Sequence, residues 1–151
     1  MRRIEALAPD LVVMAQSDNV PGKQVSNTAW ADGTAETAAT MQAAGVKTVY
    51  MLDTPVPEGD AVSCVAEHLD TVGECNQSEQ RAYAVSGRHE DVADTVRAAG
   101  VPTVEPRDWF CTDDGCPVVV QDKLVYRDQT HMSTAYSRWL EPLVAPLLRS
   151  S

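Results

Sequence analysis

One local pattern occurs twice in the chain and limits its fold more than any other feature. Residues 36–49 read ETAATMQAAGVKTV, and residues 91–104 read DVADTVRAAGVPTV. In both, a helix-forming segment ends at Ala-Ala-Gly, and a short β-branched segment follows. Gly45 and Gly100 stand where the C-terminal cap of a helix favours a left-handed residue. We interpret the repeat as the rhythm of an α/β fold, in which helices and strands alternate, and not as a duplication.

A further strand is expected near the start of the chain. Residues 10–15 read DLVVMA, and such a short, mostly apolar run is typical of a strand that is buried on both faces. Strands that alternate with helices predict an α/β, three-layer fold, with a short parallel sheet, helices on both faces and right-handed crossovers. Because no linker or low-complexity tract interrupts residues 1–151, we expect a single domain.

The C-terminal part of the chain breaks this rhythm. Residues 118–126 read VVVQDKLVY and predict a short hairpin. Ser133 or Thr134 can cap a last helix. Pro142 and Pro146 are expected to kink or interrupt that helix, because proline lacks the N–H group that a helix interior needs.

Residues 54–81 are the least regular stretch of the chain. We interpret them as an insertion with a short helix near Val65–Leu69. A cysteine pair, Cys64 and Cys75, is expected to hold this insertion together.

Four cysteines stand in two close pairs, Cys64 with Cys75 and Cys111 with Cys116. An even count in short-range pairs favours two disulfides, which indicate an oxidising compartment. Zinc is an alternative, since the four residues between Cys111 and Cys116 would suit a zinc knuckle, but the ten residues within the other pair would not. Free thiols are the remaining alternative, and no metal site is predicted.

The chain is acidic, with 22 Asp and Glu residues against 12 Lys and Arg residues and a formal net charge of -10. Such a surface repels nucleic acid and anionic lipid, so a neutral or cationic small substrate is expected. No apolar run reaches the roughly 18 residues that a membrane-spanning helix needs. Glu5, Pro9 and Asp10 break the apolar core that a signal peptide would require. Because disulfides imply export and no export signal is predicted in this chain, a segment upstream of Met1 is expected.

In open parallel sheets, ligands bind outside the carboxyl ends of the strands, and we expect three candidate loops there. They are residues 16–19, 53–55 and 128–131. In the third loop, two residues separate Asp128 from His131, so the carboxylate can contact the imidazole Nδ1 and leave Nε2 as a general base. The alternative is that Asp128 caps a turn and His131 is an ordinary surface residue.

Two other histidines, His68 and His89, lie in polar, helical surroundings, and we expect both on the solvated surface. Neither a G-x-G-x-x-G block nor a P-loop is present. A flavodoxin-like binder is therefore the weakest alternative for the chain, and no cofactor is predicted.

The sequence resembles a known family over most of its length. Residues 111–140 (CTDDGCPVVVQDKLVYRDQTHMSTAYSRWL) resemble the end of the SGNH domains that are fused to membrane acyltransferase-3 proteins. Those domains tend to carry a cysteine pair, an apolar strand, Tyr-Arg-Asp, and Asp-x-x-His-Leu-Ser before the last helix. The chain matches this order, with Met132 in place of the leucine. Residues 49–69 and 4–16 resemble the same family's cysteine-bearing insertion and its Pro-Asp-Leu-Val strand.

The resemblance implies a Ser-His-Asp site, in which serine attacks an ester carbonyl, His131 takes the proton and Asp128 orients the histidine. The family's serine lies in a Gly-Asp-Ser block after the first strand. No such block occurs here, and the nearest string is Gly59-Asp60-Ala61. The chain is therefore expected to begin at the family's second strand, without the nucleophile. Asn19 is the only candidate for the family's oxyanion asparagine, with a plain turn residue as the alternative.

By resemblance, the chain is the distal part of an SGNH-type O-acetyl esterase or acetyltransferase domain that acts on cell-envelope carbohydrate. It would be extracytoplasmic, periplasmic or at the cell surface, and follow a membrane acyltransferase domain. Its partners would be an acyl ester or a carbohydrate acyl acceptor. The isolated chain is expected to be inactive, and the alternative is a degenerate, non-catalytic SGNH-like binding module. A missing first strand would leave an exposed sheet edge for self-association.

Overall fold

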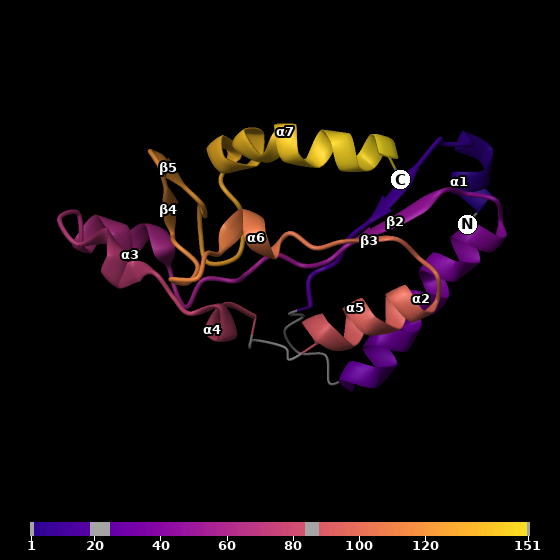
Figure 1. The fold of residues 1–151 in the computed structure, drawn as a ribbon, viewed down its shortest axis with the longest axis horizontal. Helices are drawn as coiled ribbons and strands as arrows, with labels where there is room; N and C mark the ends of the chain where they lie inside the picture. The colour runs from indigo at the N-terminus through magenta and orange to yellow at the C-terminus, as the bar shows by residue number, and fades with distance from the viewer. Residues whose placement is uncertain (1, 19–24, 84–87, 151) are drawn as a thin grey trace. The chain divides into compact units, whose positions relative to one another are not determined.

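A computed structural model describes residues 2–18, 25–83 and 88–150 (Figure 1). The chain divides into two compact units. Unit 1 consists of Met1–Asp53, Ser86–Glu105 and Pro146–Ser151, and unit 2 consists of Thr54–Val85 and Pro106–Ala145. The segment expected to be an insertion therefore forms part of unit 2.

Unit 1 contains a short parallel sheet, which confirms the predicted mixed α/β class. Within the described residues the strand order is β1-β2-β3, and the pairing places Val13 opposite Val49 and Tyr50 opposite Thr103. The strands are β1 (Val12–Met14), β2 (Thr48–Met51) and β3 (Thr103–Val104).

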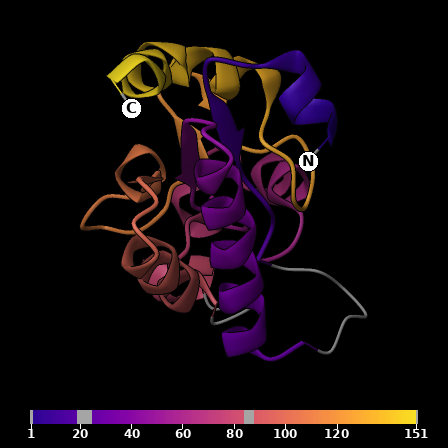
Figure 2. The same cartoon turned by 90° about the vertical axis from the view of Figure 1, so that its right-hand side faces the viewer.

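Two helices of unit 1, α2 (Asn27–Ala43) and α5 (His89–Ala98), lie side by side (Figure 2). Small residues on α2 allow the close approach, because Ala31, Ala35 and Ala38 recur at helical spacing on one face. These alanines share a buried cluster with residues of β2, of the position after it and of α5, namely Tyr50, Leu52, Val92, Ala93 and Val96. A second helix layer on the opposite face of the sheet stays a prediction. A further short helix, α1 (Arg2–Leu7), precedes β1.

The two Ala-Ala-Gly signals end helices as predicted. Gly45 and Gly100 have φ angles of 80° and 76°, in the left-handed region that residues with a Cβ atom rarely adopt. The N–H group of Gly45 donates to Gln42 O at 2.9 Å, and that of Gly100 donates to Arg97 O at 2.9 Å.

Unit 2 contains two disulfides, Cys64–Cys75 and Cys111–Cys116, and both match the predicted pairing. Apart from the last helix, its elements are short. Its buried cluster includes Phe110, Val118, Val125, Tyr136 and Leu140. The elements are α3 (Ala61–Glu67), the 3₁₀ helix η1 (Val72–Cys75), α4 (Glu79–Tyr83), α6 (Arg107–Phe110), the hairpin strands β4 (Val119–Val120) and β5 (Lys123–Leu124), and α7 (Thr134–Ser150), whose last turn belongs to unit 1.

Two helices differ from what the sequence predicts. The helix expected near Val65–Leu69 begins earlier, at Ala61, because Asp60 caps it by accepting the backbone N–H groups of Val62 and Ser63 at 3.0 and 3.1 Å. The last helix is not interrupted by its two prolines, since α7 runs from Thr134 to Ser150. Tyr136 and Leu140 of α7 are buried in the core of unit 2, and such packing supplies most of the stability of a helix in a protein. Among the described residues, no helix is both long and apolar enough to cross a bilayer.

Candidate active site

The predicted Asp-His loop was expected at the carboxyl end of a parallel strand, but it follows the antiparallel β4–β5 hairpin of unit 2. Backbone hydrogen bonds close the loop at its base. Tyr126 and Met132 face each other in an antiparallel bridge. Inside it, the N–H group of Arg127 donates to His131 O at 2.9 Å, and outside it, the N–H group of Ser133 donates to Val125 O at 2.8 Å. Residues 126–132 therefore form one closed loop with a fixed base.

Asp128 organises the interior of this loop. Its Oδ1 atom accepts the backbone N–H groups of Thr130 at 2.9 Å and His131 at 2.8 Å. His131 Nδ1 lies 2.9 Å from Asp128 Oδ1 and 3.0 Å from Oδ2. The carboxylate–imidazole contact is thus within the range that the spacing predicted, and the turn and the side-chain contact come from one carboxylate.

The electrostatics of the loop keep this carboxylate charged. Hydrogen bonds from the backbone N–H groups of Thr130 and His131 lower the pKa of Asp128 to about 2. The Arg127 guanidinium adds a positive charge, with Nε at 3.6 Å from Asp128 Oδ2. An ionised Asp128 can only accept a hydrogen bond, so the neutral imidazole carries its proton on Nδ1.

His131 is accessible, with 64% of its side chain exposed. With Nδ1 facing Asp128, Nε2 is the ring atom that can accept a proton from an incoming group, as a general base requires. The hydroxyl group of the neighbouring Ser133 is already hydrogen-bonded on both sides. It donates to Leu124 O and accepts the N–H group of Tyr136 at 3.1 Å, so Ser133 is the cap of α7.

Unit 1 holds a second ionisable cluster, at the carboxyl ends of its strands. The backbone N–H group of Asp18 donates to Asp53 Oδ2 at 2.8 Å, which joins the first two of the predicted loops. Asn19, the oxyanion candidate, lies outside the described residues. Arg88 belongs to the same cluster, because its Nη1 donates to Asp18 O at 3.1 Å.

His89 was expected on the surface, and the structure corrects this. Only 4% of its side chain is exposed, and its Nε2 lies 2.9 Å from Glu105 Oε2. Its Nδ1 is 3.9 Å from Asp18 Oδ2. The physical reason is position, because His89 opens α5 on the same helix face as the buried Val92 and Val96. That helical spacing is the signal that could have identified the residue.

Burial gives Asp18 unusual acid–base behaviour. Desolvation, followed by the nearby charge of Asp53, raises the pKa of Asp18 to about 6, although His89 and Arg88 act in the opposite direction. Burial likewise raises the pKa of Tyr50. Within the described ranges, no group of three or more histidine, cysteine, aspartate or glutamate residues is arranged to hold a metal ion.

Comparison with known proteins matches most of the chain to one family. The family model described as an SGNH domain fused to AT3 domains matches residues 1–146. A solved structure, the periplasmic domain of the lipopolysaccharide acetyltransferase of Salmonella ser. Paratyphi A, superposes with a TM-score of 0.76 at 14% sequence identity. At 14% identity the similarity is one of fold. The superposition covers 96% of this chain and 59% of the Salmonella chain, so this chain spans only part of the length of that domain. No curated protein matches the sequence.

Proposed function

This chain belongs to the family of SGNH domains that are fused to AT3 domains, and from that premise we propose that it carries the Asp-His half of an acyl-transfer site. The site would be the distal part of an O-acetyl esterase or acetyltransferase domain that acts on cell-envelope carbohydrate. The contact between Asp128 Oδ1 and His131 Nδ1, at 2.9 Å, is the observation that carries this proposal. It holds the imidazole in the tautomer that a general base needs.

In the proposed reaction, a serine hydroxyl loses its proton to His131 Nε2 as its Oγ forms a bond to the acyl carbon. The carbon–oxygen bond to the leaving alcohol breaks, and the proton passes from Nε2 to that oxygen. Asp128 stays ionised and stabilises the imidazolium that forms between these steps. A carbohydrate hydroxyl or water then loses its proton to His131 Nε2 as its oxygen bonds to the acyl carbon. The bond from that carbon to serine Oγ breaks, and the proton passes from Nε2 to Oγ.

The serine itself is assigned to a segment outside these 151 residues, because the sequence contains no Gly-Asp-Ser block. The whole-protein setting follows from analogy with the neighbour, which is described as a periplasmic domain of a lipopolysaccharide acetyltransferase. Two disulfides support an extracytoplasmic location. The fused AT3 domain would be the membrane partner that exchanges acyl groups with the site.

A second candidate, a degenerate binding module, is favoured by the same missing Gly-Asp-Ser block. The two candidates differ in the coding sequence directly upstream of Met1. The acyl-transfer proposal expects an in-frame Gly-Asp-Ser block there, and its absence would favour the binding module.

An assay of the isolated chain tests the division of labour. We expect no turnover of 4-nitrophenyl acetate by the purified 151-residue chain beyond that of a His131→Ala variant, because a base without a nucleophile and a complete oxyanion site forgoes roughly 3–4 kcal/mol of stabilisation per missing donor. Turnover well above the variant, blocked by a serine-directed inhibitor, would place the nucleophile within the chain and overturn this assignment. Ser17 would then be the first serine to substitute.

A further inference from the structure

We infer that Tyr126 is a positioning residue for the Asp128–His131 pair, and that the loop closed by Cys111–Cys116 supports it through Gln77. The inference deepens the proposed function and rests on it for its biological meaning. Its structural content depends only on contacts within unit 2.

Tyr126 anchors an otherwise exposed loop. The residue is 3% exposed, and its phenol O–H group donates to Pro55 O at 2.9 Å. Tyr126 lies two positions before Asp128 and bridges to Met132, which directly follows His131. The phenol therefore fixes both ends of the loop at the point from which the carboxylate and the imidazole project.

The carbonyl group that receives this bond is itself held in place. The N–H group of Val56 belongs to the same peptide unit as Pro55 O and donates to Ala82 O at 3.0 Å. The Val56 carbonyl oxygen accepts a hydrogen bond from Gln77 Nε2 at 2.7 Å. The Oε1 atom of the same Gln77 amide accepts the N–H group of Glu58 at 2.9 Å. One buried amide thus fixes the backbone on both sides of Pro57.

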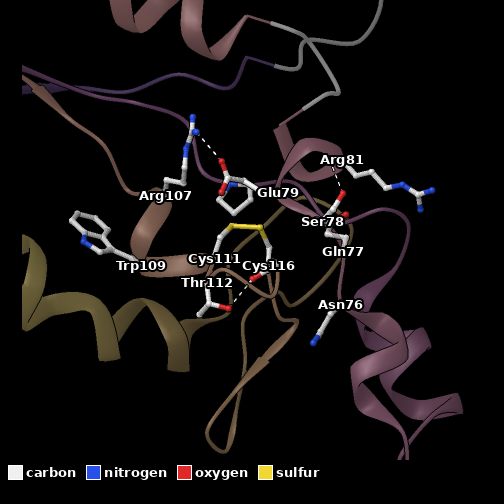
Figure 3. The surroundings of a disulfide bond; sticks show 12 residues. Asn76, Gln77, Ser78, Glu79, Arg81, Arg107, Trp109, Cys111, Thr112 and Cys116 are labelled. Atoms are coloured by element: carbon white, nitrogen blue, oxygen red, sulfur yellow. Dashed lines mark hydrogen bonds and ion pairs between the residues drawn. A yellow bond between two sulfur atoms is a disulfide. The ribbon is translucent and has the colours of Figure 1, made fainter.

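Gln77 is fixed in turn by the disulfide loop. The N–H group of Cys116 donates to Gln77 O at 2.8 Å, and the N–H group of Gln77 donates to Cys116 O at 3.3 Å. Figure 3 shows Gln77 beside the Cys111–Cys116 bond. Gly115 makes this approach sterically possible, because it has φ of 111° and a Cβ atom there would lie 2.5 Å from Gln77 O.

A spectroscopic test separates positioning from simple stabilisation. Long-range ¹H–¹⁵N spectra of the ¹⁵N-histidine-labelled chain report the tautomer of the neutral His131 ring, with His68 in the same unit as an internal reference. Wild type is expected to show mainly the Nδ1–H form. Tyr126→Phe is expected to shift the population toward the Nε2–H form that unconstrained histidine prefers.

Tyr136→Phe is the matched control, because Tyr136 is also buried in unit 2 and its O–H group also donates to a backbone carbonyl, that of Trp109. Both variants are expected to lose a similar amount in Tm, but only Tyr126→Phe should change the tautomer of His131. An unchanged tautomer in Tyr126→Phe, or equal changes in both variants, would overturn the inference for Tyr126.

A pair of glycine variants tests the link through Gln77. Gly115→Ala introduces the contact with Gln77 O, whereas Gly59→Ala introduces comparable backbone strain, with φ of 90° and no atom within 4 Å of the added Cβ. We expect Gly115→Ala to shift the His131 tautomer in the same direction as Tyr126→Phe, and Gly59→Ala to leave it unchanged. If both glycine variants leave it unchanged, the role of Gln77 is wrong and that of Tyr126 stands. The readout needs no catalysis, so an inactive Asp128–His131 pair would refute the proposed function without affecting this inference.

Discussion

Asp128 holds His131 twice, since its Oδ1 atom accepts the backbone N–H group of His131 at 2.8 Å and lies 2.9 Å from the Nδ1 atom of the same residue. The turn that places the imidazole and the contact that orients it therefore depend on one carboxylate. This coupling explains why two exposed side chains keep a defined relative geometry.

The contribution of Asp128 to the stability of the fold should be lost in acid. The native pKa of Asp128, about 2, is below the ordinary value of 3.8, so the ionised carboxylate stabilises the fold above pH 4 and this stabilisation is lost as the pH falls toward 2. Asp128→Asn should therefore be less stable than wild type at pH 5, and the difference should shrink toward pH 2. Urea unfolding across this range measures it, and a difference that is constant with pH would contradict the assignment.

Unit 1 should show the opposite dependence through Asp18. Its native pKa of about 6 is above the ordinary value of 3.8, so the folded state binds the proton more tightly and loses stability as the pH rises from 4 to 6. Removing this penalty should make Asp18→Asn gain stability relative to wild type at pH 7, by on the order of 3 kcal/mol at most.

Urea unfolding between pH 4 and pH 8 measures the effect of Asp18. Asp10→Asn is a suitable control, because Asp10 is an exposed carboxylate of the same unit. If Asp18→Asn keeps the wild-type pH dependence, the buried carboxyl is not the titrating group.

The disulfide of the 54–81 segment should contribute measurably to stability. Replacing Cys64 and Cys75 together by alanine is expected to lower the free energy of unfolding by roughly 2–3 kcal/mol, since the chain-entropy model gives this value for a loop so short. The pairing is checked by non-reducing peptide mass mapping. Free alkylation of all four cysteines, or cross-paired peptides, would show that the pairing is wrong.

The outer strand of the sheet predicts self-association. Among the described residues β1 pairs with β2 alone, and Val13 on β1 is 39% exposed. An edge strand can pair with a second copy of the chain. We expect Val13→Lys to reduce association in sedimentation velocity. Val25→Lys, at a similarly exposed valine outside the strands, should leave it unchanged. A wild-type chain that is monomeric at all concentrations would refute the proposal.

The sequence predicted the features that depend on local chemistry. Gly45 and Gly100 marked helix ends because a left-handed cap needs a residue without a Cβ atom. Asp128 and His131 could be paired because their spacing confines both to one turn. These signals require no knowledge of distant parts of the chain.

Other features depend on long-range packing and could not be predicted from the sequence. His89 is polar by residue type, yet it lies on the apolar face of α5 and is buried against Glu105, which directly follows β3. The two prolines of α7 were expected to kink or interrupt the helix. The helix is continuous, because local propensity takes no account of the packing that stabilises it. The role of Gln77 is likewise invisible in sequence, since its partners Val56 and Cys116 lie far from it along the chain.

We propose His131 as the general base of an acyl-transfer site. This role is tested most directly in a protein that joins this chain to the serine-bearing segment expected upstream, by measuring kcat/KM for an acetyl ester. His131→Ala is expected to lower kcat/KM by roughly 10³-fold or more. His68→Ala, a histidine paired with Glu74 in the same unit, should leave kcat/KM unchanged. Equal activity of wild type and His131→Ala would contradict this role.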